Sequence, residues 1–157
     1  LIIYHFMFGP DWEQGCAGCT MFADDFNGII EYLNDRDASM VVVSRAPLEK
    51  LQAYKERMGW RFRWVSSEHS DFNFDYDVSF HETGPSLKMF NFEEVKDLEM
   101  EENFGVSVFY HSDQGEIFHT YRSHARSVDP LSTSFQLMDL LPKGRSDGNS
   151  DNNFRRA

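Results

Sequence analysis

Cys16 and Cys19, two cysteines separated by two residues, are the side chains of this sequence best suited to covalent chemistry. A thiolate attacks disulfides, and a second thiol nearby can then release the attacked group by closing a small ring. The pair lies between an apolar segment of strand length (residues 1–8) and a segment with helical periodicity. A helix N-terminus stabilises a thiolate through unpaired N–H groups and a partial positive charge. The sequence therefore predicts a redox-active dithiol in which Cys16 attacks and Cys19 resolves.

Other interpretations of the two cysteines stay open. They could be part of a zinc site, but structural zinc usually takes four ligands and only histidines are left to supply the others. They could also be structural cysteines in a non-enzymatic binding module, which requires no reactive thiol. The redox interpretation needs no metal and no cofactor, and its partner would be a protein or small-molecule disulfide.

Three other side chains are candidates for a role beside the dithiol. Arg45 follows an expected strand and would offset the charge of a thiolate, although it could equally be a solvated surface cation. Trp12 would shape a partner site or pack under its loop. His69, which follows the next expected strand, is the histidine best placed at this edge, because the carboxyl ends of parallel strands meet there. His5, in contrast, lies inside the first expected strand and is interpreted as a core residue whose polar atoms are hydrogen-bonded.

Composition excludes several classes of partner. The formal net charge is −11, which argues against binding to nucleic acid or to an anionic membrane surface. No apolar run approaches the roughly 20 residues that span a bilayer. Two cysteines in 157 residues are not a disulfide framework, so we expect a cytoplasmic protein. Whether it forms a homodimer is left open.

The chain predicts a single α/β domain over residues 1–145, followed by a disordered polar tail over 146–157. Because the sequence opens on an apolar run without an initiator Met, we also expect a natural segment to precede Leu1. Alternation of strands and helices in the first half predicts parallel strands with right-handed crossovers. The expected strands are residues 1–8, 40–44 and 62–65, and the expected helices cover residues 19–33 and 47–58.

The second half is less regular. Residues 66–80 are expected to form an ordered loop, and the acidic segment 81–103 to contain a short helix around residues 92–98. Residues 106–110 and 116–121 flank a turn and predict a β-hairpin. Asp129 and Pro130 predict the start of a last helix, with an inner face formed by Leu131, Phe135, Met138 and Leu141.

Several segments resemble one known family over nearly the whole chain, to about residue 145. They include Gly-Cys-Ala-Gly-Cys (15–19) and Val-Ser-Arg-Ala-Pro-Leu-Glu-Lys (43–50). The further segments are residues 4–12, 57–60, 64–67, 71–75, 118–121 and 139–145. Together they are similar to the DUF899 family, a thioredoxin-like group without an established activity. The resemblance implies a thioredoxin-like fold with a peroxiredoxin-like elaboration, in which a central mixed β-sheet is flanked by helices.

The dithiol itself differs from that of relatives with known activity. Thioredoxins have a Trp directly before the first cysteine, where this chain has Gly15, and a proline opposite the dithiol, where it has Gly105–Ser107. Peroxiredoxins have a Thr three residues before the reactive cysteine, and here Glu13 stands three residues before Cys16. Peroxidase activity is therefore not expected from the resemblance.

Overall fold

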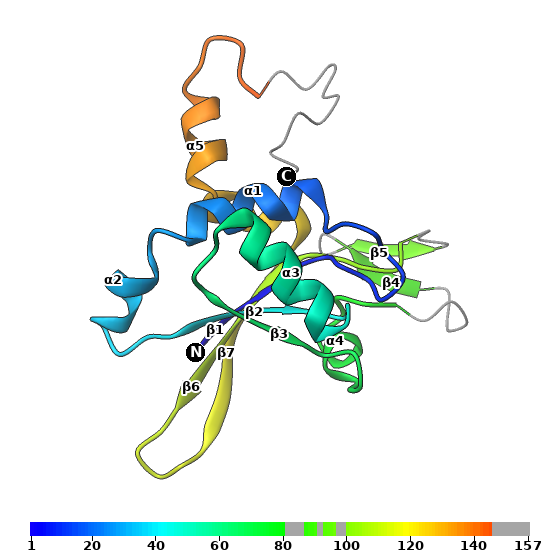
Figure 1. The fold of residues 1–157 in the computed structure, drawn as a ribbon, viewed down its shortest axis with the longest axis vertical. Coiled ribbons are helices and arrows are strands. Elements are labelled where there is room, and N and C mark those ends of the chain that lie inside the picture. The colour runs from blue at the N-terminus through cyan, green and yellow to red at the C-terminus, as the bar shows by residue number, and fades with distance from the viewer. Residues whose placement is uncertain (81–86, 91–92, 97–99, 146–157) are drawn as a thin grey trace.

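The computed structural model describes residues 1–80, 87–90, 93–96 and 100–145, and it contains a five-stranded sheet in the order β3-β2-β1-β6-β7 (Figure 1). Its strands are β1 (Ile2–His5), β2 (Met40–Ser44), β3 (Arg63–Ser66), β6 (Gly105–His111) and β7 (Ile117–His124). β1, β2 and β3 are parallel, whereas β6 runs antiparallel to both β1 and β7. This mixed sheet with flanking helices confirms the predicted thioredoxin-like α/β fold.

Helices follow the strands as the crossovers predict. The α-helices are α1 (Ala17–Phe26), α2 (Ile30–Asn34), α3 (Leu48–Met58), α4 (Phe72–Asp75) and α5 (Thr133–Asp139), and η1 (Ala125–Leu131) is a 3-10 helix. Helix α3 matches its prediction closely, because Pro47 is its N-cap and Gly59 ends it with a left-handed φ of 69°. No helix of the described residues is long and apolar enough to cross a membrane.

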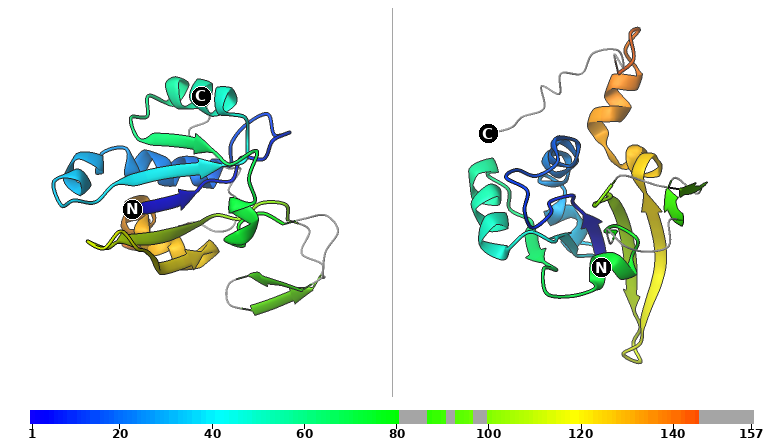
Figure 2. Two further views of the ribbon diagram at one scale, coloured as in Figure 1. Left: turned by 90° about the horizontal axis from the view of Figure 1, so that it is seen from below. Right: turned by 90° about the vertical axis from the view of Figure 1, so that its right-hand side faces the viewer.

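A core made largely of aromatic rings joins one face of the sheet to α1, α3 and η1. The Phe6 ring lies 4.7 Å from Trp64, measured between ring centroids, and the Tyr4 ring stacks on Phe22 at 5.9 Å. Helices α1 and α3 are also joined by a hydrogen bond of 2.9 Å between the hydroxyls of Thr20 and Tyr54. The helices carrying the crossovers therefore cover the same face of the sheet (Figure 2).

The predicted helix over residues 19–33 is in fact two helices, because the chain turns at Asn27–Ile29 between α1 and α2. The last helix also begins later than predicted. Pro130 lies inside η1, and Ser132 rather than Asp129 caps α5 by accepting a hydrogen bond from the Phe135 backbone N–H.

The inner face of α5 is narrower than predicted. Phe135 and Met138 pack against the core, whereas Leu131 and Leu141 are 45% and 57% exposed.

The helix predicted around residues 92–98 is wrong where the structure describes that segment. β5 (Glu93–Lys96) is a strand that pairs antiparallel with β4 (Leu87–Phe90), forming a second, two-stranded sheet. Backbone pairing between the two segments overrides the weak helical pattern. In the expected loop 66–80, residues 72–75 form the short helix α4. The tail predicted over residues 146–157 lies outside the described residues.

The other face of the sheet carries two histidines in register across three strands. His5 of β1 pairs with Gly105 of β6, which pairs with His124 of β7. A Cβ atom at Gly105 would lie 2.4 Å from the His124 ring, so glycine is required for the ring to lie over β6. His5 is buried, and its Nε2 shares a hydrogen bond of 2.9 Å with Ser107 Oγ. Its Nδ1 has no hydrogen-bond partner among the described residues. His5 is therefore a core residue with only one of its two ring nitrogens hydrogen-bonded.

Burial keeps His5 neutral. Desolvation, with smaller contributions from His124, His119 and Arg122, lowers the pKa of His5 from 6.5 to about 3. Above pH 6.5 the imidazole is neutral in both the folded and the unfolded chain. As the pH falls from 6.5 towards 3, the unfolded chain binds a proton that the folded chain does not. His5 therefore lowers the free energy of unfolding by up to about 1.4 kcal/mol per pH unit over that window.

We predict that His5→Gln makes the stability less dependent on pH over this window, because the proton uptake of the unfolded chain at this position is removed. Urea denaturation at a series of pH values measures the slope. His111→Gln is the matched control, because residue 111 is exposed at the end of β6. Equal slopes in the parent and the His5 variant would contradict the assignment.

Candidate active site

Cys16 is the N-cap residue of helix α1 and is partly exposed. Its backbone N–H donates a hydrogen bond of 3.0 Å to the Met7 carbonyl, just beyond the end of β1. The loop between residues 8 and 16 therefore returns to the strand it left, and the helix starts directly over it. The structure confirms that the dithiol lies at a strand-to-helix junction.

Gly15 makes this return possible. A Cβ atom at residue 15 would lie 2.6 Å from the Phe6 ring, a separation at which the two groups would collide. The Phe6 side chain is 1% exposed and is held by the surrounding aromatic rings. The Gly before the dithiol, which differs from the Trp of thioredoxins, is thus required by the packing of Phe6.

Cys19 lies one turn into the same helix and is only 2% exposed. Burial is the largest cause that raises the pKa of the Cys19 thiol above its usual value, followed by the hydrogen-bonding interaction with Cys16 and the charge of Cys16. The Met7 backbone N–H and the Tyr4 hydroxyl act in the opposite direction, with smaller effect. Cys19 is therefore a protonated thiol at neutral pH, in interaction with an accessible Cys16.

Trp12 lies in the loop that leads to the dithiol and is half-buried against the core. Its ring covers Gly9 so closely that a Cβ atom there would lie 2.8 Å from Trp12 Nε1. Lys50 of α3 donates hydrogen bonds to the carbonyls of Pro10 and Trp12, at 3.0 and 2.8 Å. The loop is thus fastened to α3, and Trp12 combines core contact with partial exposure.

Arg45 is paired with a buried carboxyl group in this structure. Its guanidinium Nη1 lies 2.9 Å from Glu102 Oε1 and its Cζ lies 4.6 Å from the centre of the Phe74 ring. Glu102 also accepts a hydrogen bond of 2.8 Å from Ser79 Oγ. Burial still raises the pKa of Glu102, although Ser79 and Arg45 act against it. The charge of Arg45 therefore balances a buried carboxyl group. The contact of its guanidinium with Phe74 joins the end of β2 to α4.

His69 is at the predicted edge of the sheet but does not meet the dithiol. Its side chain is 91% exposed, and its nearest charged neighbour is Glu68, with Nε2 and Oε2 separated by 3.7 Å. Within the described part of the chain, no three His, Cys, Asp or Glu side chains are grouped so that they could hold a metal ion. A site that joins the cysteines to His69 is therefore not assembled here.

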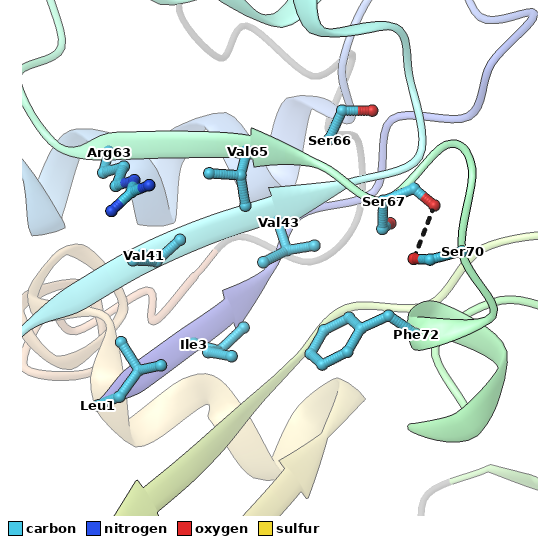
Figure 3. A pocket seen from close by; sticks show the side chains of 10 residues that line it. All are labelled: Leu1, Ile3, Val41, Val43, Arg63, Val65, Ser66, Ser67, Ser70 and Phe72. Atoms are coloured by element: carbon cyan, nitrogen blue, oxygen red, sulfur yellow. Dashed lines mark hydrogen bonds between the residues drawn. The ribbon is translucent and has the colours of Figure 1, made fainter.

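A cavity of about 370 Å³ opens on the opposite face of the sheet (Figure 3). The side chains of Val41, Val43 and Val65 point into it, with the helices on the far side of the strands. Its remaining lining comes from Leu1, from Ile3 of β1, from Arg63 and from the segment between Ser66 and Phe72. Neither cysteine contributes to this cavity, so it is separate from the dithiol.

Sequence reasoning missed three residues that shape the site, namely Tyr4, Met7 and Lys50. Tyr4 and Met7 belong to an apolar run whose pattern indicates burial but not what each residue faces. Lys50 lies on a predicted helix, where the sequence alone indicates an exposed cation. Only the strand-to-helix arrangement brings them to the dithiol and its loop.

We predict opposite effects when alanine replaces the two glycines beside the dithiol. Gly15→Ala forces a collision with Phe6, and overpacking of this kind costs about 1–3 kcal/mol. Gly18→Ala is the matched control, because a Cβ atom there would lie 3.9 Å from Cys16 Sγ and alanine favours the helix by roughly 0.5–1 kcal/mol. Chemical denaturation of both variants measures the difference. Equal stability of the two variants would contradict the role given to Gly15.

Several solved structures are similar to this chain over most of its length. Peroxiredoxin Q of Xanthomonas campestris is 17% identical, with 87% of this chain and 78% of that chain covered and a TM-score of 0.48. A bacterioferritin comigratory protein of the same organism, described for alkyl peroxide reduction, is 18% identical over 81% of this chain and 71% of its own, with a TM-score of 0.48. A cysteine-to-serine mutant of Xylella fastidiosa PrxQ is 12% identical over 87% and 76%, with a TM-score of 0.49.

No curated protein sequence matches this chain. The family model described as "Bacterial protein of unknown function (DUF899)" matches residues 1–157, which is the whole chain. The resemblance inferred from the sequence segments is thereby confirmed, and the chain belongs to the DUF899 family.

Proposed function

We propose that this protein is a thiol–disulfide oxidoreductase that uses Cys16 and Cys19 as its reactive pair. The observation that supports the proposal is the asymmetry of the two thiols. Cys16 is partly exposed at the N-cap of α1, while Cys19 is buried one turn further along and interacts with it. A disulfide substrate can reach Cys16, and the mixed disulfide that follows has its resolving thiol already in place.

The reaction has two steps. The Cys16 thiolate attacks one sulfur of the substrate disulfide, forming a mixed disulfide and expelling the other sulfur as a thiolate, which takes up a proton. Cys19 then loses its proton and attacks Cys16 Sγ, which releases the second substrate thiol and leaves a Cys16–Cys19 disulfide. The substrate gains two electrons and two protons, and the protein dithiol loses them. An external thiol or dithiol must reduce the pair before the next cycle.

The position of Cys16 explains why it would react first. As the N-cap it lies at the positive end of a ten-residue helix, which favours a thiolate over a thiol. Cys19, in contrast, is withdrawn from water and has its pKa raised by burial. The order of attack expected from the sequence therefore has a physical basis in the exposure of the two thiols.

A non-enzymatic binding module is the alternative that the sequence left open. It accounts for the fold but needs neither an accessible thiol nor a second thiol in interaction with it. The partner in our proposal is a protein or small-molecule disulfide, and Trp12, half-buried in the adjoining loop, is the side chain best placed to contact it.

We predict that the two cysteine-to-serine variants behave differently with a small aromatic disulfide. Cys16→Ser should lose the reaction, because the attacking thiolate is gone. Cys19→Ser should release one equivalent of thiol and then stop as a mixed disulfide on Cys16, visible by mass spectrometry. The parent should release two equivalents. Each single variant serves as the control for the other.

The proposal fails if Cys16→Ser reduces the disulfide at the rate of the parent. It also fails if the parent itself stops after one equivalent, because Cys19 would then not resolve the intermediate. A binding module predicts no difference in disulfide reduction between the parent and either variant.

A further inference from the structure

The Tyr4 hydroxyl is a buried polar group that the fold leaves unpaired. Tyr4 is 0% exposed, and its Oη has no hydrogen bond of normal geometry within the described part of the chain. Leaving a buried donor without a partner destabilises a folded protein. The group with which this hydroxyl interacts is the Cys19 thiol. Tyr4 and Cys19 are therefore neighbours in the core, and no other hydrogen bond of the described residues engages the Tyr4 hydroxyl.

Ionisation of Cys19 would change this relationship. A neutral thiol is a weak acceptor, whereas hydrogen bonds to an ionised acceptor are roughly twice as strong as those between neutral groups. The resolving step is the point at which Cys19 must carry a negative charge. The unpaired hydroxyl thus acquires a strong acceptor at that stage of the cycle.

We propose that Tyr4 is the hydrogen-bond donor that stabilises the Cys19 thiolate during the resolving step. The proposal rests on the oxidoreductase function given above and deepens it by naming the group that assists resolution. In this step Cys19 gives up its proton, its sulfur forms a bond with Cys16 Sγ, and the bond between Cys16 and the substrate breaks. The proton lost by Cys19 passes to solvent, and the departing substrate thiolate takes one up from solvent, so no net proton is gained or lost in this step. Tyr4 keeps its own proton throughout and acts through the hydrogen bond.

The surroundings of Tyr4 suit a donor and not a base. Burial raises the pKa of the Tyr4 hydroxyl well above its usual value, with smaller contributions from Cys19 and Cys16, so the group stays protonated. Its ring is held between Phe22 and Phe26, with ring centroids at 5.9 and 5.0 Å. The ring that carries the hydroxyl is therefore fixed by the packing of the core.

The variant Tyr4→Phe tests the proposal, because it removes one oxygen and keeps the ring in the core. Tyr54→Phe is the matched control. It also removes a buried hydroxyl beside α1, but that hydroxyl bonds to Thr20 and not to a cysteine. Stopped-flow measurement with a small aromatic disulfide separates attack from resolution, since each releases one thiol. We expect Tyr4→Phe to slow resolution about tenfold or more, which is the effect of losing one hydrogen bond to a charged group, and to leave the attack step within about twofold of the parent.

A second measurement does not depend on turnover. In a Cys16→Ser background, the pKa of Cys19 is followed through its ¹³Cβ chemical shift, with and without Tyr4→Phe. We expect the Cys19 pKa to rise by about one unit when the Tyr4 hydroxyl is removed. This readout remains informative if the protein reduces no disulfide, so failure of the proposed function is distinguishable from failure of the role of Tyr4.

Two results would overturn the proposal. An unchanged Cys19 pKa in Tyr4→Phe would show that the hydroxyl does not stabilise the thiolate. Equal slowing of resolution in Tyr4→Phe and Tyr54→Phe would show that loss of any buried hydroxyl near α1 has this effect.

Discussion

The close approach of the Gly15 backbone to the Phe6 ring is the constraint on which the site depends. It allows the loop after β1 to turn back so that the Cys16 N–H reaches the Met7 carbonyl at 3.0 Å. Because this bond fixes the first residue of α1, it also fixes which helix positions face the sheet. Cys19, one turn later, then falls in the core, while Cys16 stays at the surface. A bulkier residue at position 15 would displace the start of the helix and, with it, both thiols.

The arrangement of layers explains why two thiols so close in sequence have such different surroundings. The crossover helices pack on one face of the sheet, where aromatic rings form the core. Cys16 is at the edge of this layer and Cys19 is inside it. The opposite face carries the valine-lined cavity and the two histidines, His5 and His124, which are in register through Gly105. His5 also stacks on the Phe72 ring of α4. The dithiol, at the start of α1, and His5, on β1, therefore lie on opposite sides of the sheet.

Local patterns predicted those parts of the molecule that local chemistry determines. β2, α3 and the hairpin β6–β7 carry β-branched runs, helical periodicity or a turn signal, and they form where expected. The predicted helix at residues 92–98 failed because pairing between β4 and β5 decides that segment. Arg45 was correctly placed at the edge of the sheet, but its partner Glu102 is 57 positions away in sequence, and no pattern near Arg45 indicates a buried carboxyl group. The dithiol was predictable from spacing and context, whereas Tyr4 was not, because its role depends on which buried group its hydroxyl meets.

Two cations of this acidic chain, Arg45 and Lys50, interact with groups other than the thiols. The charge of Arg45 is balanced by Glu102, and the Lys50 ammonium binds two loop carbonyls. The groups that act on Cys19 to favour its ionised form, the Met7 N–H and the Tyr4 hydroxyl, are neutral. A permanent cation beside Cys19 would hold it as a thiolate at all times, whereas neutral donors leave burial dominant and the thiol protonated. In the proposed reaction Cys19 therefore stays unreactive until a mixed disulfide on Cys16 presents a sulfur to attack. The order of the two steps then follows from the difference between a helix terminus and a buried position one turn further along the same helix.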